Sequence, residues 1–289
     1  MKTQLFVGQS SLRGALGKYA KRFNLLEMRA ELGRVPRAAL LRRWTEEVAS
    51  KFVFSVMLSR HAGRFDQDYT AALELGLQTV EALNAKWVVI QTDPTVGPSQ
   101  RSKQRLQGLF AHFLEAGRRV AWEPHGVWQD EDAAAWTREL GVHLVRDISR
   151  GEAINEAIIY SRLPGLGTSS RMSAGALENA AASLMHASEA YVVVCGDGAG
   201  KAAQLLRGLT TDAAGTDRSM AGAFEIQEVF GAFTDEEDIE EFEDESDDEI
   251  DEDAPEVGDE QQNPDETLDN DSERSIRGAS KKKREVRRR

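Results

Sequence analysis

Residues 190–203, AYVVVCGDGAGKAA, contain a strand, a turn and the start of a helix in one short stretch. Apolar residues at successive positions, most of them β-branched, are typical of a strand buried on both faces of a parallel sheet. Three glycines interrupt the run, and an alanine-rich segment with Lys201 follows them. The stretch therefore predicts a buried parallel strand, a tight loop and the beginning of a helix.

The same stretch does not match a phosphate-binding P-loop. That motif needs four residues between its two glycines and a Ser or Thr after the lysine. Here only three residues separate Gly196 from Gly200, and Ala202 follows Lys201, so the hydroxyl that would bind magnesium is missing. The first strand–helix turn, VGQSSLRG (7–14), also lacks the glycine pattern of dinucleotide-binding folds. The sequence implies no cofactor.

Similar apolar runs recur throughout the first two thirds of the chain. They lie at 4–8, 24–28, 52–58, 86–92, 118–124, 142–147, 157–163 and 190–197. Helical patterns separate them at 12–22, 36–50, 68–83, 99–116, 130–139 and 174–187, with one very short helix expected near 150–155 and a last helix at 198–209. Eight strand–helix units predict an α/β fold, a (β/α)₈ TIM-type barrel over residues 1–211. An open Rossmann-like sheet is the alternative.

Beyond the barrel the composition changes. Residues 212–233 read as a linker or an extra helix, and 234–289 as a disordered charged tail, acidic first and then basic. From Asp235 to Glu273 there are 23 acidic residues and no basic one, and from Arg274 to Arg289 there are nine basic residues and one acid. The basic end predicts weak contact with a polyanion or a protein partner through 274–289, the alternative being a solvated segment that aids solubility.

The cysteine content and the lengths of the apolar stretches indicate where in the cell the protein is expected. Cys195 is the only cysteine, so no intramolecular disulfide can form, and we interpret it as a small buried strand residue. The N-terminal apolar run is too short for a signal-peptide core, and no stretch approaches the roughly 20 apolar residues of a membrane helix. We expect a cytoplasmic protein without membrane contact. The sequence indicates no oligomeric state.

Polar residues stand where the predicted strands end. The catalytic groups of such barrels lie at the C-terminal ends of the strands, so these residues predict a polar pocket. Glu27, Glu123 and Arg162 are the strongest candidates, because each is embedded in an apolar run and a buried charge must be paired or used. The full set comprises catalytic candidates Glu27, Glu123, His125 and Asp197, and substrate-binding candidates Arg60, Gln91, Asp147, Arg162, Gly198 and Gly200.

Two functions from different classes fit this pattern. In the first, a hydrolase or lyase uses Glu27 and Glu123 as acid–base groups on a small polar or phosphorylated substrate, with Gly198 and Gly200 letting the backbone approach an anion. In the second, a non-catalytic barrel serves as a binding or scaffold module, and Arg162 merely pairs with Glu27 or Glu123 as a structural ion pair. No metal site is expected, because the five histidines show no ligand spacing.

Several segments together resemble the YecE-like family, catalogued as domain of unknown function 72. The resemblance rests on FVGQSS (6–11), YAKRFNLLEM (19–28), the helix and strand VPRAALLRRWTEEVASKFVFSVMLSR (35–60), VVIQTDP (88–94), AWEPHGVW (121–128) and the closing residues 176–203. It implies a TIM barrel over residues 4 to about 210 and no established reaction. The positions that match the family's pattern are Gly8, Asn24, Glu27, Arg60, Gln91, Glu123, Trp128, Asp147, Arg162, Asp197 and Gly200.

The chain departs from that pattern at other polar positions. The family's glycine and tryptophan after the first strand are replaced by Ser11 and Leu12, and its asparagine after the glutamate by Arg29. Met57 stands where the family has a lysine, and Pro164 where it has a histidine. The resemblance therefore implies a divergent member whose activity is changed, reduced or absent.

Overall fold

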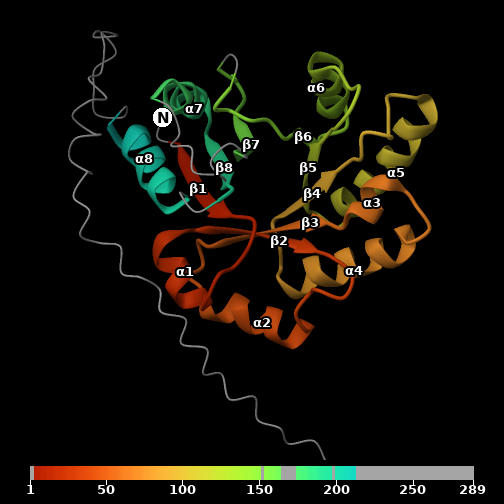
Figure 1. Cartoon of the computed structure of the whole chain (residues 1–289), viewed down its shortest axis with the longest axis horizontal. Coiled ribbons are helices and arrows are strands. Elements are labelled where there is room, and N and C mark those ends of the chain that lie inside the picture. Colours follow the sequence, from red (N-terminus) through yellow and green to blue (C-terminus); the bar gives the residue numbers. More distant parts are fainter. Residues whose placement is uncertain (1–2, 151–152, 164–173, 197–198, 213–289) are drawn as a thin grey trace, which may run out of the picture. The chain divides into compact units, whose positions relative to one another are not determined.

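The computed structural model describes residues 3–150, 153–163, 174–196 and 199–212, and within them eight parallel strands form one sheet surrounded by helices (Figure 1). The strands are β1 (Gln4–Gln9), β2 (Leu25–Ala30), β3 (Val53–Leu58), β4 (Trp87–Gln91), β5 (Arg119–Glu123), β6 (His143–Leu144), β7 (Ile158–Leu163) and β8 (Glu189–Val194). The helices are α1 (Leu16–Arg22), α2 (Ala38–Glu47), α3 (Arg60–Arg64), α4 (Tyr69–Ala82), α5 (Gln100–Glu115), α6 (Asp130–Glu139), α7 (Ala174–His186) and α8 (Ala199–Asp212).

The order of the strands is that of a barrel. Each strand pairs in parallel with its neighbours in the order β6-β5-β4-β3-β2-β1-β8-β7. The remaining seam, between β6 and β7, is joined by a single parallel bridge from Arg146 to Ser161. The predicted (β/α)₈ fold is thus confirmed as a nearly closed barrel, and the Rossmann-like alternative is wrong because the two edge strands meet.

Two apolar clusters explain why the strands read as continuous apolar runs. The inner cluster contains strand residues and Val145, which directly follows β6, and it fills the barrel, with Trp87, Tyr160 and Tyr191 as its largest side chains. The outer cluster joins the other strand face to the helices and includes Phe110, Phe113 and Trp122. Successive strand residues point to opposite faces, so both alternating sets must be apolar. A strand that is buried on both faces therefore appears in the sequence as a continuous apolar run.

The chain between β6 and β7 differs from the prediction. The strand expected at 142–147 pairs with β5 only over β6, and the very short helix expected near 150–155 does not form in residues 148–150 or 153–157. Asp147 explains the difference, because its Oδ1 accepts from the backbone N–H of Ser149 at 3.0 Å and its carbonyl accepts from Arg150 N at 3.2 Å. A side chain that closes a turn in this way competes with helix formation.

Two smaller findings concern strand ends. β8 ends at Val194, one residue before Cys195, which is half-buried rather than a buried strand residue as expected. A one-turn helix, α3, follows β3 where the sequence suggested only a loop. Gly63 makes this helix fit, since a Cβ there would lie 1.9 Å from the backbone oxygen of Gln91 at the end of β4.

None of the helices in the described part of the chain is long and apolar enough to cross a membrane. The predicted linker beyond Asp212 and the predicted tail, 234–289, lie outside the described residues.

Candidate functional site

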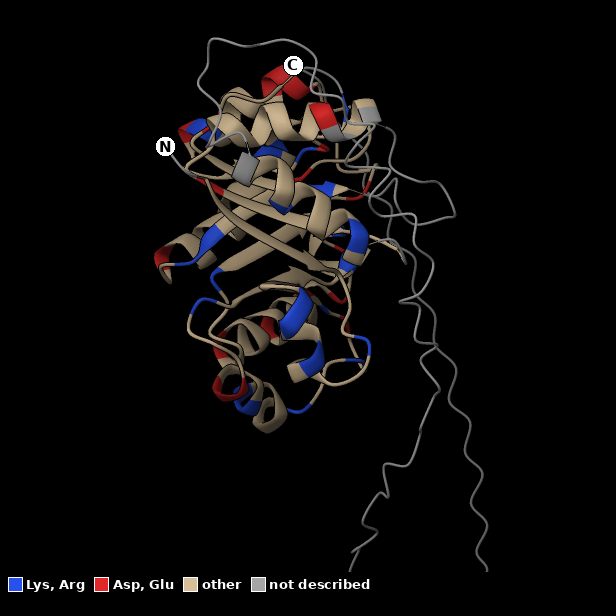
Figure 2. Cartoon of the chain, turned by 90° about the vertical axis from the view of Figure 1, so that its left-hand side faces the viewer, with Lys and Arg blue, Asp and Glu red and all other residues tan. Residues whose placement is uncertain are grey.

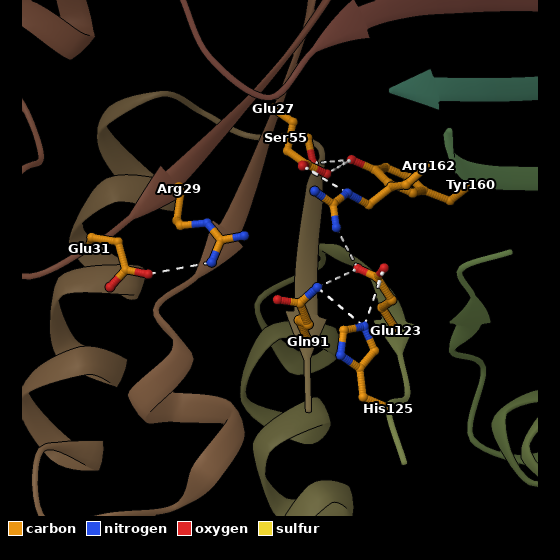
Figure 3. A network of polar contacts seen from close by, with 9 residues as sticks. All are labelled: Glu27, Arg29, Glu31, Ser55, Gln91, Glu123, His125, Tyr160 and Arg162. Atoms are coloured by element: carbon orange, nitrogen blue, oxygen red, sulfur yellow. Dashed lines mark hydrogen bonds and ion pairs between the residues drawn. The ribbon is translucent and has the colours of Figure 1, made fainter. Parts of the chain in front are cut away.

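The C-terminal ends of β2, β4, β5 and β7 carry one connected polar network (Figure 3). The barrel register produces it, because inward-facing positions two residues apart stack from the apolar interior toward the mouth. Glu27 pairs in register with Ser55 across β2 and β3, and Gln91 with Glu123 across β4 and β5. Residues distant in the sequence are therefore held on one inner surface by rigid strands.

Arg162 of β7 is the centre of the network. Its Nη1 donates to Glu123 Oε2 at 2.6 Å, and its Nε lies 3.2 Å from Glu27 Oε1. The second contact is an ion pair without the alignment of a hydrogen bond, since neither atom has a hydrogen-bond partner. Burial alone would lower the pKa of Arg162, but the two carboxylates together raise it above its usual value. The guanidinium is therefore permanently charged and shared between two acids.

Glu27 lies at the floor of the network, with its side chain 1% exposed. Burial raises the pKa of Glu27, although the Arg162 guanidinium and the Tyr160 hydroxyl act in the opposite direction. Tyr160 OH donates to Glu27 Oε2 at 2.8 Å and lies 2.7 Å from Ser55 Oγ. Burial and the nearby Glu27 carboxylate raise the pKa of Tyr160 well above its ordinary value, so its proton remains available for this bond.

Glu123 forms the outer part of the network, at the mouth. Gln91 Nε2 donates to Glu123 Oε2 at 3.1 Å, and His125 Nε2 lies 3.6 Å from Glu123 Oε1. Gln91 and His125 are themselves 3.4 Å apart. The side chains of Glu123 and His125 are 21% and 42% exposed, so water or a ligand can reach both. The network thus runs from a sealed carboxylate to an accessible one.

The structure does not bring all the predicted residues into this network. Arg60 opens α3 as an exposed residue, and among the described residues no contact joins it to the network. Asp147 closes its own turn and forms an ion pair with Arg150 Nε at 3.2 Å. Gly200 lies in the first turn of α8. Asp197 and Gly198 lie outside the described residues.

Four further residues belong to the mouth and did not stand out in the sequence. Tyr160 bonds to Glu27 and Ser55 bonds to Tyr160, as described, and Arg29 Nη1 lies 3.6 Å from Glu31 Oε1 beside the main group. Glu31 also accepts from Ser59 Oγ at 2.8 Å. Strand alternation could have identified two of them, because residues two positions apart in a strand point to the same face. Arg29 follows Glu27 by two positions and Tyr160 precedes Arg162 by two.

Within the part of the chain that the structure describes, one group has the geometry to hold a cation. The ligand atoms of His61, Asp66 and Asp68 all lie within 4.8 Å of one another, on α3 and the loop after it. His61 Nδ1 is already bonded to Asp66 Oδ2 at 2.8 Å, and this hydrogen bond lowers the pKa of Asp66. Because the ring nitrogen that would bind the ion is occupied by a carboxylate, we assign no metal to this group.

Comparison with known proteins identifies relatives of the whole barrel. The family model described as "Protein of unknown function DUF72" matches residues 4–225. A DUF72 family protein from Enterococcus faecalis V583 superimposes with a TM-score of 0.58 at 17% identity, covering 72% of this chain and 98% of that one. Another, from Thermotoga maritima MSB8, does so with a TM-score of 0.54 at 15% identity, covering 71% and 99%. No curated protein matches the sequence significantly.

Proposed function

The chain belongs to the DUF72 family, and we propose that its barrel mouth binds a small, neutral, hydroxyl-bearing molecule and performs acid–base chemistry on it. One observation carries the proposal. Three charged side chains from β2, β5 and β7 meet through direct contacts at the end of the barrel where such folds carry out catalysis. A purely structural barrel core has no need of a carboxylate as buried as Glu27, because burying a charge costs several kcal/mol.

The exposures divide the roles among the network residues. Glu27 is sealed beneath Arg162, so its role is to orient the guanidinium, with Tyr160 and Ser55 holding it in place. Glu123 and His125 reach the surface of the mouth, where each can exchange a proton with a bound molecule; they lie 3.6 Å apart, beyond direct hydrogen-bond reach of each other. They are the proposed acid–base pair of a hydrolase or lyase reaction, and Gln91 is the proposed hydrogen-bonding partner of the substrate.

The charge balance favours a neutral substrate over a phosphorylated one. The residues in Figure 3 include three carboxylates, Glu27, Glu31 and Glu123, and two guanidinium groups, Arg29 and Arg162. Two guanidinium groups against three carboxyl groups give these five residues a formal charge of −1. Each guanidinium is already paired with a carboxylate. An incoming phosphate would have to displace one of these pairs, whereas hydroxyl groups can donate to the carboxylates that are present.

A binding screen on the full chain tests this proposal. Thermal unfolding is measured with D-xylose, D-ribose and D-glucitol, and with ribose 5-phosphate and glucose 6-phosphate as charged counterparts. We expect stabilisation by at least one neutral compound, loss of that stabilisation in Glu123→Gln, and its retention in Glu131→Gln, an exposed acid on α6. Turnover of the bound compound is then followed by proton NMR in D2O. Stabilisation by the phosphate esters alone, or binding that survives Glu123→Gln, contradicts the proposal.

A second candidate function is polyanion binding by a non-catalytic barrel. The observation that favours it is a set of exposed cations on and around α1 and α2, which we call the basic surface: Lys18, Lys21, Arg22, Arg34, Arg37, Arg42, Arg43 and Lys51. Among the described residues none of them has an acidic partner. Figure 2 shows Lys and Arg on the lower helices, with Asp and Glu among them.

The basic surface makes a separate prediction. Fluorescence anisotropy with a short DNA duplex should show an affinity that falls steeply with salt, because binding releases counterions from the phosphates. Arg42→Glu with Arg43→Glu should weaken binding, while the matched pair Arg101→Glu with Arg138→Glu, on α5 and α6, should have a smaller effect. Deleting 274–289 measures the contribution of the basic end of the sequence. Equal losses in the two double variants would contradict a role for the basic surface.

A further inference from the structure

A cavity opens at the other end of the barrel, around the N-terminal ends of β1, β3 and β4. Its volume is about 450 Å³, within the range of about 300–1,000 Å³ that small-molecule sites occupy. The C-terminal end of α2 and the segment that leads from it into β3 form one wall, and residues 83–86 form part of another. This end of a barrel normally contributes stability rather than catalysis. The cavity is therefore separate from the polar network at the mouth.

The lining has an apolar base and a polar rim. Phe6, Phe54 and Leu83 are almost fully buried beneath the cavity, and the half-buried Phe52 is the ring in its lining that remains partly exposed. The exposed Lys51 lies at the rim, as does Asn84. Arg118 Nη1 donates to Asn84 Oδ1 at 2.8 Å, which leaves the Asn84 side-chain nitrogen as a donor. A molecule in this cavity would bury an apolar part against the Phe52 ring and meet hydrogen-bond donors at the entrance.

Lys86 brings a second ammonium group to the cavity, and its position is fixed. Its Nζ bonds to the Tyr191 hydroxyl and to Glu189 Oε2 and lies 5.6 Å from the centre of the Phe6 ring. Its side chain is nevertheless 39% exposed. A cation that is already held in place loses little conformational entropy when it receives a ligand, which favours binding.

The charge balance here is opposite to that at the mouth. Glu189 Oε2 is shared between Lys86 Nζ at 3.3 Å and Arg119 Nη1 at 2.6 Å, so one carboxylate faces two cations. Lys51 and Arg118, which bonds to Asn84 at the rim, add two more cations, so these five groups carry four positive charges against one negative charge. Burial lowers the pKa of the nearby His143, so at neutral pH it adds no charge. The cavity therefore favours an anion, whereas the mouth does not.

We propose that this cavity is a second ligand site that binds a small molecule with a flat aromatic body and one anionic group. The aromatic body packs on the partly exposed Phe52 ring, and the anionic group lies between Lys51 and Lys86 within reach of Asn84. A flat ring and a single anion match a lining that combines the partly exposed Phe52 ring with two ammonium groups. The site is independent of the proposed acid–base chemistry, because it shares no residue with the network at the mouth.

Isothermal titration calorimetry on the full chain tests the site with 2-naphthoate and its neutral analogue 2-naphthamide as probes. We expect naphthoate to bind about tenfold more tightly than the amide, the magnitude of a charge-assisted hydrogen bond. Lys51→Glu should weaken naphthoate binding by at least that factor. The control Lys18→Glu makes the same charge change on α1, outside the cavity, and should bind as the unaltered chain does.

Two further variants separate this site from others. Ala49→Trp places a large ring at an exposed position of the rim and should abolish naphthoate binding without touching the charges. Glu123→Gln, at the mouth, should leave naphthoate binding unchanged, so that failure of the mouth proposal and failure of this one are distinguishable. The inference is overturned if naphthoate shows no binding at millimolar concentration, if acid and amide bind equally, or if Lys51→Glu behaves like Lys18→Glu.

Discussion

Replacing Arg162 with methionine should destabilise the barrel strongly, because the most buried carboxylate of the network would lose its cation. The Glu27 side chain is 1% exposed and would lose its cation, keeping only the hydrogen bond from Tyr160. Breaking a buried ion pair by removing one partner costs about 3–5 kcal/mol. For a barrel of this size each kcal/mol shifts the unfolding temperature by roughly 2–4 °C, so Arg162→Met should lower it by about 6–20 °C.

The loss should depend on pH with a definite sign. Burial already raises the pKa of Glu27, and removing the Arg162 guanidinium removes the main influence that lowers it. A carboxyl whose pKa is higher in the folded than in the unfolded state binds more protons when folded, so stability falls as the pH rises through the folded pKa. The destabilisation in Arg162→Met should therefore be smaller at about pH 5 than at about pH 8.

Two double variants test the assignment of the cost to Glu27. Arg162→Met combined with Glu27→Gln removes the stranded charge and should recover at least about 2 kcal/mol relative to Arg162→Met alone. The combination with Glu123→Gln should recover less than about 1 kcal/mol, because Glu123 is 21% exposed and water can solvate it. Urea unfolding followed by circular dichroism gives these free energies. If Arg162→Met costs less than about 1 kcal/mol, or both double variants recover equally, the reasoning is wrong.

Four other substitutions have expected outcomes. Gly63→Ala should destabilise the barrel by about 1–3 kcal/mol in urea unfolding, because the added Cβ would collide with Gln91 O. Gly108→Ala, which has open space around it on α5, should instead stabilise the barrel by about 0.5–1 kcal/mol in the same measurement. Arg119 and its neighbours lower the pKa of Glu189 to about 2. The contribution of the Glu189 carboxylate to folding stability is therefore present above about pH 4.5 and is lost as the pH falls toward 2. An acid titration followed by circular dichroism should show a smaller loss of stability over that range in Glu189→Gln than in the unaltered chain, and equal losses would contradict the assignment. Tyr160→Phe removes the hydrogen bond to the Glu27 carboxylate and should cost about 1.5–3 kcal/mol in urea unfolding, and a cost near zero would mean that the bond contributes nothing.

The barrel could be predicted because its signal is local and repeated. An apolar run marks each strand in the sequence. The helical pattern predicted at 130–139 coincides with α6 as observed. The prediction was wrong where a side chain redirected the backbone, as Asp147 does after β6, because such a turn depends on one hydrogen bond and not on a periodic pattern. One-turn α3 was missed for a similar reason, since a helix of this length has no periodicity.

The candidate site could be predicted only in part. Glu27, Glu123 and Arg162 interrupt apolar runs, and an embedded charge is visible in the sequence itself. Tyr160 and Ser55 were missed because a tyrosine or serine in a strand reads as ordinary. Only the bond from Tyr160 to Glu27, and that between Ser55 and Tyr160, show their role. The candidates Arg60 and Asp147 are polar strand-end residues that make no contact with the network among the described residues.

The sequence by itself determined the fold class, the position of nearly every strand and the identity of the buried charges, because the hydrophobic effect acts on patterns that lie along the chain. Which charges meet, and how deeply each is buried, was decided only by the tertiary structure. The register of β2, β5 and β7 sets the distances from Arg162 to Glu27 and Glu123, and those distances are not encoded in any local pattern. The opposite charge balance at the two ends of the barrel follows from the same closure, since Lys86 and Glu189 are 103 residues apart in sequence and meet only when β4 and β8 face one interior.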